Sequence, residues 1–180
     1  MAKNTFSATH LTSISQLCHE LNWKDFKVKM ENGQYLTANN FSLIAIGNPD
    51  SQNEKWIMDV KDEKYNNTCD LIYALVVEGK LLKLGKSITT MKERISSYHC
   101  GKNAYRQKKN ATNSATNWFI LQSVIAMGKP VYVYAFFTER SYGEFMGEKF
   151  QNRISKEIEA IILARFAEQY GFRPLGNRQR

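Results

Sequence analysis

Five polar side chains between residues 71 and 98 have types and spacings that suit the binding of an anion: Tyr73, Lys83, Lys86, Arg94 and Tyr98. The first tyrosine lies inside an apolar run, LIYALVV, and the two lysines lie in the run that follows, KLLKLGKS. Arg94 and Tyr98 are one helical turn apart, so they share a face of the predicted helix. A phenol beside several cations can bind a phosphate group and can also accept a proton, because the cations favour its phenolate form.

The position of Lys83 relative to Tyr73 depends on the turn between the two runs. If residues 78–80 form the turn, Tyr73 lies opposite Gly85, and Lys83 points to the same side as Tyr73. If residues 78–79 form the turn, Lys83 points to the other side. In the first register, the glycine leaves room for a substrate beside the phenol.

A carboxylate lies within the apolar face of the last predicted helix, residues 155–170. Ile162, Leu163 and Phe166 follow Glu159 at helical spacing, so the four side chains share one face. An unpaired carboxylate is costly in such a position, and Glu159 therefore requires a cation beside it. The sequence leaves two partners open, a divalent metal ion or a core arginine or lysine.

The apolar patterns predict a small antiparallel sheet that helices flank. Residues 71–77 and 131–137 are typical of strands buried on both faces, and residues 81–87 form a return strand. Thr89 or Thr90 caps the helix that carries Arg94. The other predicted elements are a buried helix at 118–127, a hairpin at 142–150 and the helix 155–170, which Gly171 ends. We expect an α+β fold with a three-stranded core in which strand 71–77 is central.

Residues 1–69 precede this core and form a predicted N-terminal extension. The Glu-Asn-Gly sequence at residues 31–33 predicts a hairpin turn, and the apolar run 41–46 predicts a strand. Residues 47–69 are polar and rich in turn formers, which predicts a linker. We therefore expect two parts, the extension 1–69 and a domain 70–180.

The composition favours a polyanionic partner. The chain has 180 residues, a net charge of +8 and a pI near 9.4, which favours nucleic acid first and an anionic membrane second. The segment 101–117 has the pattern of a basic loop around a tyrosine. No apolar run approaches the roughly 18–20 residues that a membrane helix needs, and the first residues lack a secretory signal. Three cysteines, an odd number, predict free thiols in the cytoplasm.

The order and spacing of these motifs resemble the GIY-YIG nuclease superfamily over roughly residues 70–177. Residues 71–73, LIY, stand in the place of Gly-Ile-Tyr, and residues 83–85, KLG, stand in the place of Tyr-Ile-Gly. Arg94 matches the arginine of the following helix, Glu159 matches a metal-binding glutamate on a late helix, and Asn177 matches a polar residue near the chain end.

Two departures from the superfamily pattern bear on the chemistry. Leu71 replaces the first glycine, and Lys83 replaces the second motif tyrosine. The Gly-Lys-Ser that follows looks like the nuclease domain of the UvrC excision-repair proteins. The pattern of the whole chain is closer to the small GIY-YIG type II restriction endonucleases, in which a lysine at the position of Lys83 is known.

The resemblance implies metal-assisted hydrolysis of a DNA phosphodiester bond. Glu159 would hold one Mg²⁺ ion, for which Mn²⁺ can substitute, Arg94 would contact the phosphate, and Tyr73 would accept a proton from the attacking water. The remaining members of the predicted catalytic set are Lys83, Lys86 and Tyr98. The predicted DNA contacts are Lys102, Tyr105, Arg106, Lys108, Lys109, His99 and Asn177.

The small size of the chain favours a type II restriction endonuclease that cuts double-stranded DNA at a short palindromic site. One metal site per chain suits one strand cut, so we expect a homodimer whose surface draws on the extension, including the run 41–46. A companion DNA methyltransferase encoded nearby is expected. Two alternatives stay open, a repair or mobile-element nuclease of the same superfamily and a non-catalytic DNA-binding protein.

Overall fold

A five-stranded antiparallel sheet organises the computed structural model of the chain, which describes residue 17 and residues 19–106, 113–139 and 141–177. The strands lie in the order β4-β3-β7-β5-β6. Their bounds are β3 (Ser42–Asp50), β4 (Lys55–Val60), β5 (Leu71–Val77), β6 (Lys80–Ser87) and β7 (Val131–Phe137). Within the unit β7-β5-β6, β5 is central, as predicted, and the predicted α+β class is confirmed.

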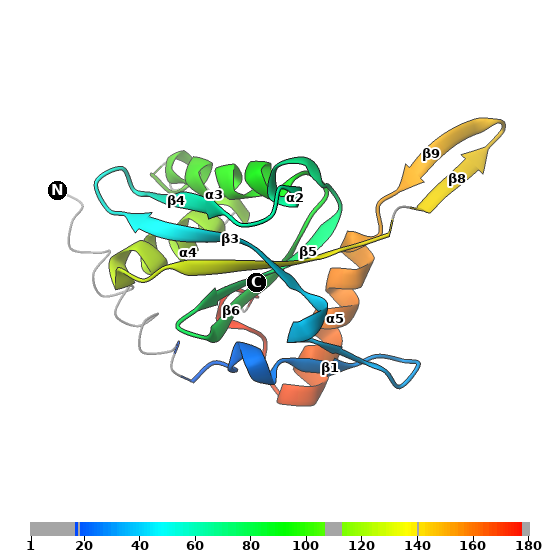
Figure 1. The fold of residues 1–180 in the computed structure, drawn as a ribbon, viewed down its shortest axis with the longest axis horizontal. Coiled ribbons are helices and arrows are strands. Elements are labelled where there is room, and N and C mark those ends of the chain that lie inside the picture. The colour runs from blue at the N-terminus through cyan, green and yellow to red at the C-terminus, as the bar shows by residue number, and fades with distance from the viewer. Residues whose placement is uncertain (1–16, 18, 107–112, 140, 178–180) are drawn as a thin grey trace.

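Helices and short N-terminal elements cover the two faces of the sheet. The helices are α2 (Lys64–Asn67), α3 (Met91–Arg106), α4 (Asn113–Met127) and α5 (Ser155–Tyr170). Every residue of β5 is buried. Its odd-numbered side chains pack with α3 and α4, and its even-numbered ones pack with α5 and the N-terminal elements. Figure 1 shows α3 and α4 on one side of the sheet and α5 on the other.

The turn between β5 and β6 differs from the expected one, yet the expected register at Tyr73 is present. Glu78 and Gly79 alone form the turn, both with positive φ, and Val77 pairs with Lys80. The register then shifts by one residue, so that Leu82 is the extra residue of a bulge. Because of this bulge, Lys83 lies on the side of Tyr73 despite the two-residue turn.

The start of α3 is fixed by local hydrogen bonds. The Glu93 backbone N–H donates to the Thr90 hydroxyl, and the Thr90 backbone N–H donates to the Glu93 carboxylate. This reciprocal pair is a capping box, and it confirms Thr90 as the predicted cap. Ile88 precedes α3 and is exposed.

The described parts of the predicted loop at 101–117 are helical. α3 continues to Arg106, and α4 begins at Asn113. The backbone of Lys102, Tyr105 and Arg106 therefore lies on α3, while Lys108 and Lys109 lie outside the described residues. The loop prediction rested on the polar composition of this segment, and a polar composition does not prevent a helix.

The N-terminal residues are part of the same sheet. The predicted linker 47–69 instead contains the end of β3, all of β4 and α2, and β3 pairs with β7. Phe41, Ile44 and Ala45 are buried, so these three side chains of the run 41–46 pack in the core of their own chain and are not available to the dimer surface that we expected.

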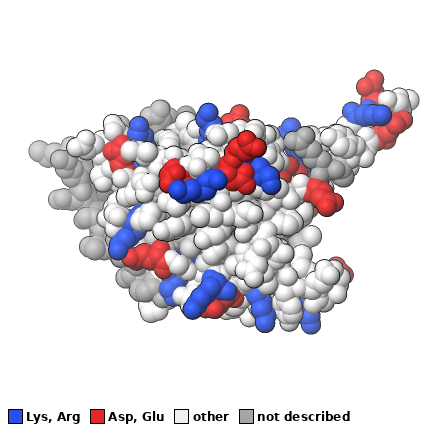
Figure 2. All heavy atoms as spheres, in the orientation of Figure 1, with Lys and Arg blue, Asp and Glu red and all other residues white. Residues whose placement is uncertain are grey.

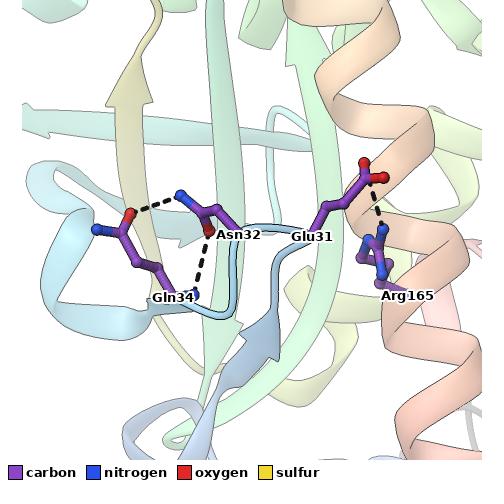
Figure 3. A network of polar contacts seen from close by, with 4 residues as sticks. All are labelled: Glu31, Asn32, Gln34 and Arg165. Atoms are coloured by element: carbon purple, nitrogen blue, oxygen red, sulfur yellow. Dashed lines mark hydrogen bonds and ion pairs between the residues drawn. The ribbon is translucent and has the colours of Figure 1, made fainter.

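The predicted hairpin turn at residues 31–33 is confirmed. It joins β1 (Lys27–Lys29) to β2 (Tyr35–Thr37). The Asn32 amide group donates to Gln34 over 2.9 Å and accepts from the Gln34 backbone over 3.1 Å, while Arg165 of α5 lies 3.9 Å from Glu31 (Figure 3). This hairpin is therefore held against α5.

The remaining described elements are short. Three 3₁₀ turns, η1 (Trp23–Asp25), η2 (Ala38–Asn40) and η3 (Leu175–Asn177), flank the hairpin and close the described chain. The predicted hairpin at 142–150 is present as β8 (Ser141–Phe145) and β9 (Glu148–Asn152). α5 ends at Gly171, whose φ of 76° is left-handed. Within the described residues, no helix combines the length and the apolar character that a membrane span requires.

Candidate active site

A polar cleft of about 510 Å³ lies where the end of β6, the first turns of α3 and the first turns of α5 meet. Four of the predicted catalytic residues line it, and they come from these three elements: Lys83, Lys86, Arg94 and Glu159. The other lining residues are Ser87, Ile88, Thr89, Glu93, Ser97, Asn117, Gly176 and Asn177. Segments that are far apart in the sequence thus build one cleft that contains cationic side chains and two carboxylates, Glu93 and Glu159.

Glu159 is half-buried on α5 and faces the cleft. Burial raises the pKa of its carboxyl group, and the positive charges of Lys86, Lys83 and Arg94 partly offset this effect. A hydrogen bond from the Lys86 backbone acts in the same direction as these charges. The pKa stays raised overall, so these positive charges do not fully offset the cost of burying the charged carboxylate.

Lys83 is a buried lysine whose ammonium group has neutral hydrogen-bond acceptors. Its Nζ donates to the backbone oxygen of Gly176 over 3.1 Å and to Oδ1 of Asn117 over 3.4 Å. Burial lowers the pKa of Lys83, and the nearby charge of Arg94 adds to this effect, whereas Tyr73 and Glu159 oppose it. These contacts fix the end of the side chain within the cleft.

Tyr73, Tyr98 and Arg94 form a hydrogen-bonded cluster behind the cleft. The hydroxyl groups of Tyr73 and Tyr98 are 2.9 Å apart, and Nε of Arg94 donates to the Tyr73 hydroxyl over 3.1 Å. Both tyrosines are fully buried, and the Arg94 guanidinium lies 5.8 Å and 5.7 Å from their ring centres. Tyr98 therefore contacts Tyr73 directly.

The two ionisable neighbours of Tyr73 differ in charge. Burial raises the pKa of Tyr98 well above the ordinary value of a phenol, so Tyr98 is neutral. Burial also acts against the charge of Arg94, but the interactions with Tyr73, Tyr98 and Glu159 outweigh it and raise the pKa of Arg94. Arg94 is thus a permanent cation that joins the Tyr73 hydroxyl to the cleft.

Gly85 makes room for Tyr73 itself and not for a substrate, contrary to our expectation. A Cβ atom at residue 85 would lie 2.4 Å from Cζ and 2.5 Å from the hydroxyl oxygen of Tyr73. The two residues are direct partners across β5 and β6. A glycine is therefore required here, because the phenol group of Tyr73 occupies the space that a Cβ atom would need.

We predict that Gly85→Ala destabilises the chain by about 1–3 kcal/mol, because the added methyl group overpacks against the phenol ring. Urea unfolding measures this loss. Combining the change with Tyr73→Val, which removes the ring, should recover part of the loss, so that the double variant is more stable than the sum of the two single effects predicts. If the stability losses of the two single variants simply add in the double variant, the close approach of residues 73 and 85 is not the cause of the loss in Gly85→Ala.

Asn177 uses its side chain to complete an edge strand. The Leu84 backbone N–H donates to Oδ1 of Asn177 over 2.9 Å, and Nδ2 of Asn177 donates to the Leu84 oxygen over 2.7 Å. β6 is the last strand of its sheet, so these bonds satisfy backbone groups that lack a neighbouring strand. Asn177 lines the cleft as well, but both its amide atoms are bound to β6.

The structure places His99 away from the cleft. Its Nε2 accepts a hydrogen bond from the Trp56 backbone N–H on β4 over 3.4 Å. Burial, and then the nearby Lys55, lower the pKa of His99. The imidazole is therefore a neutral acceptor between α3 and β4, and the expected phosphate contact of His99 is not supported by this position.

This hydrogen bond predicts a pH dependence of stability. The pKa of His99 is lowered in the fold from 6.5, so as the pH falls below that value the unfolded chain binds the proton first and the stability decreases. His99→Gln keeps a side-chain oxygen as acceptor without a titrating group. Its urea midpoint should therefore depend less on pH between about 5 and 7 than that of the wild type. Identical pH profiles of the two proteins would contradict this role.

Sequence patterns did not reveal Asn117 and Gly176 as site residues. Asn117 belongs to a segment that we interpreted as a loop, and its link to Lys83 joins residues on α4 and β6. A Cβ atom on Gly176 would lie 2.8 Å from Cβ of Lys83. The available signals were a polar residue at the start of an apolar helix and a glycine beside Asn177, and neither specifies a partner.

The cleft has the donor set that a magnesium ion uses when a substrate phosphate completes its coordination. Mg²⁺ is commonly held by one or two carboxylates, phosphate oxygens and water. Glu159 supplies one carboxylate in a polar cleft with room for these groups. Among the described residues, no three side chains of His, Cys, Asp and Glu cluster as a metal cage, so an ion here would depend on Glu159 and substrate.

Comparisons with known proteins identify relatives of this chain. A scan against family models and a search of curated proteins return no match. Among solved structures, "Restriction endonuclease HPY188I in complex with product DNA" is 34% identical, with 93% of this chain and 91% of that chain covered and a TM-score of 0.64. A mutant of EndoII of bacteriophage T4 is 18% identical, with 78% and 95% covered and a TM-score of 0.51, and it shares the fold. This chain belongs to the same family as restriction endonuclease HPY188I.

Proposed function

We propose that this chain is a type II restriction endonuclease that hydrolyses phosphodiester bonds of double-stranded DNA at a short, palindromic sequence, with the chemistry of the GIY-YIG nucleases. The observation that carries the proposal is the meeting of Glu159, Arg94, Lys83 and Lys86 in one cleft. A positively charged cleft binds the phosphate, and a carboxylate within it supplies the ligand for a divalent ion. The relative in complex with product DNA supports the choice of substrate.

Each side chain of the cleft has a role in the proposed reaction. Arg94 binds an oxygen of the scissile phosphate through its guanidinium, and Lys86 adds positive charge where the phosphate enters. Glu159 holds Mg²⁺, or Mn²⁺ in its place. When bound, the ion supplies charge stabilisation for the phosphate and the leaving oxygen. Tyr98 holds the Tyr73 hydroxyl in position through the bond between the two hydroxyl groups.

Tyr73 accepts the proton of the attacking water in this proposal. The role requires its phenolate, and Arg94 is the cation whose N–H group contacts that oxygen. The burial of Lys83 supports a second candidate for the proton acceptor, which is Lys83 itself. Burial lowers its pKa, and a neutral lysine amine can accept a proton. The two candidates are distinguished by which variant stops cleaving DNA, Tyr73→Phe or Lys83→Met.

We also propose how the chain meets DNA and assembles. The helix that carries Arg94 continues to Arg106, and Lys102, Tyr105 and Arg106 near its end are the proposed contacts to the DNA backbone. Each chain offers one Glu159, which suits one strand cut, so a homodimer would cut both strands of a palindrome. A nearby gene for a DNA methyltransferase would fit this role.

Incubation of the purified protein with plasmid DNA tests the proposal. Discrete linear fragments with Mg²⁺, and none with EDTA, are the expected result. Nicking or cleavage only at branched substrates would favour a repair or mobile-element nuclease. A gel shift without any cleavage, in Mg²⁺ and in Mn²⁺, would contradict the enzymatic proposal and indicate a DNA-binding protein.

A further inference from the structure

The Lys83 ammonium is held by two segments that lie outside the motif region 71–98. Asn117 lies in the second turn of α4, and Gly176 lies in η3 near the end of the described chain. Oδ1 of Asn117 accepts a hydrogen bond from Nζ of Lys83 over 3.4 Å, and the Gly176 backbone oxygen accepts another over 3.1 Å. A helix and a C-terminal turn therefore meet at the tip of one side chain.

Both side chains of the contact between Lys83 and Asn117 are buried. Lys83 is 8% exposed and Asn117 is 3% exposed. A buried ammonium that loses an acceptor cannot readily exchange it for water, so the loss is costly. The amide oxygen of Asn117 is therefore a strong constraint on the position of the Lys83 nitrogen.

The stem of Lys83 is confined as closely as its tip. A Cβ atom on Gly176 would lie 2.8 Å from Cβ of Lys83, 3.1 Å from Cδ1 of Ile120 and 3.1 Å from the backbone oxygen of Leu82. The backbone of η3 thus packs directly against the lysine, with α4 on the other side of the glycine. Such close packing leaves the stem few alternative positions.

The acceptors of Lys83 differ from those of lysines on the surface. Lys61 and Lys129 are exposed and pair with carboxylates, Asp59 at 2.6 Å and Glu78 at 2.8 Å. Figure 2 shows basic and acidic side chains next to each other on one face of the molecule. The two acceptors of Lys83 are instead an amide oxygen and a peptide oxygen, and neither carries a charge.

Neutral acceptors leave the ammonium available to the cleft. Glu93 and Glu159 line the same cleft, yet the hydrogen bonds of Lys83 go to Asn117 and Gly176. An ammonium has three donors, and these two bonds use two of them. The acceptors therefore fix the nitrogen without neutralising it, and one donor stays for a phosphate oxygen or a water molecule.

We propose that Asn117 is a positioning residue, whose neutral amide oxygen holds the Lys83 nitrogen at the place where it meets the scissile phosphate or the attacking water. Because Lys83 serves DNA cleavage in the proposed function, this role of Asn117 rests on that function. It applies whether Lys83 acts as a cation beside Tyr73 or as the proton acceptor, since both roles need the nitrogen at a fixed place. A displacement of about 1 Å can cost about 10²-fold in rate.

Asn117→Leu tests this role, because it removes the acceptor and keeps a similar volume. The single-turnover rate of duplex cleavage should fall about 10-fold or more. The dissociation constant for DNA, measured in Ca²⁺, should stay within about threefold of the wild-type value. Gln122→Leu is the matched control, since Gln122 is another buried amide side chain of α4 and donates to the Glu54 backbone oxygen over 3.5 Å. It should leave the cleavage rate unchanged.

Asn117→Asp tests whether the acceptor must be neutral. The change keeps an oxygen atom at the same place but adds a negative charge, which binds the ammonium as an ion pair and competes with the phosphate. The cleavage rate should therefore fall although an acceptor is still present. Cleavage at the wild-type rate would overturn the requirement for a neutral acceptor.

A double-mutant cycle separates an action through Lys83 from a general effect on α4. Urea unfolding is measured for Asn117→Leu, for Lys83→Met and for their combination. The combination should be more stable than the two single losses predict, because Lys83→Met removes the ammonium that Asn117→Leu deprives of an acceptor. Gln122→Leu combined with Lys83→Met should show additive losses.

Three results would overturn the inference. One is cleavage by Asn117→Leu at the rate of Gln122→Leu. Another is a loss of DNA affinity in Asn117→Leu as large as its loss of rate, which would make Asn117 a DNA contact. The third is additive stability losses of Asn117→Leu and Lys83→Met. If the wild type cuts no DNA, the proposed function fails, and the unfolding cycle, which needs neither DNA nor metal, still decides whether Asn117 holds Lys83.

Discussion

Replacing Glu159 by Gln should abolish DNA cleavage while DNA binding remains. The change removes the one carboxylate that α5 offers to the cleft and keeps nearly the same shape. Metal-supplied charge stabilisation is worth several kcal/mol, so we expect a loss of about 10³-fold or more in the rate of cleavage. Single-turnover cleavage of an oligonucleotide duplex measures the rate, and a gel shift in Ca²⁺ measures binding.

The stability of the Glu159→Gln variant separates a chemical role from a structural one. Burial raises the pKa of Glu159, so its charged form is less favourable in the fold than in the unfolded chain at neutral pH. The neutral amide avoids this cost, and the melting temperature should not fall. A variant that loses both cleavage and stability would instead indicate that Glu159 is a structural ion-pair partner.

Two carboxylates on neighbouring segments serve as controls. Glu157→Gln changes an exposed residue of α5 and should leave cleavage unchanged. Glu93→Gln changes the other carboxylate that lines the cleft, which is bound to Thr90, and should weaken the start of α3 with a small effect on the rate. Full activity of Glu159→Gln together with inactivity of Glu93→Gln would reverse the assignment of the metal ligand.

Tyr73→Phe should reduce cleavage by about 10²- to 10⁴-fold, the range that a general base contributes. The change removes only the hydroxyl that Arg94 and Tyr98 contact, so the ring still fills the space over Gly85. Tyr98→Phe is the matched control, because it removes the other hydroxyl of the same bond. It should lower the rate less, since Arg94 still holds the Tyr73 hydroxyl.

Comparison with Lys83→Met decides between the two candidate bases. If Tyr73 accepts the proton, Lys83→Met retains a slow reaction, because the proton acceptor is still present and only a cation of the cleft is gone. If Lys83 accepts the proton, Lys83→Met is inactive at every pH, and Tyr73→Phe retains activity. Normal cleavage by Tyr73→Phe would make Tyr73 a core aromatic residue.

Local patterns were sufficient to predict the elements that carry the site. The apolar run of β5, the Thr90 cap of α3 and the position of Glu159 within the apolar face of α5 depend on residues within one or two turns of each other. Hydrophobic period and capping chemistry describe such short-range relations. For this reason the α+β class, the central place of β5 in its three-stranded unit and the hairpin turn at residues 31–33 were predicted correctly.

The tertiary structure decided which of these residues meet. The bulge at Leu82 restores the register of Lys83 after a turn that would have reversed it, and the Lys83 ammonium is then bound by Asn117 and Gly176. Those contacts join segments 34 and 93 residues apart. No sequence period encodes them, because they depend on how helices and sheet pack.

The role of Gly85 also depends on packing and not on the sequence motif alone. The sequence offered two registers for β5 and β6, and Gly85 faces Tyr73 in only one of them. Only the packed structure decided that the ring of Tyr73 occupies the space over that glycine, and that β3 and β4 extend the sheet through β7. A protein core is closely packed, so the space that each side chain occupies depends on the volumes of its neighbours. Those neighbours come from segments that are distant in the sequence.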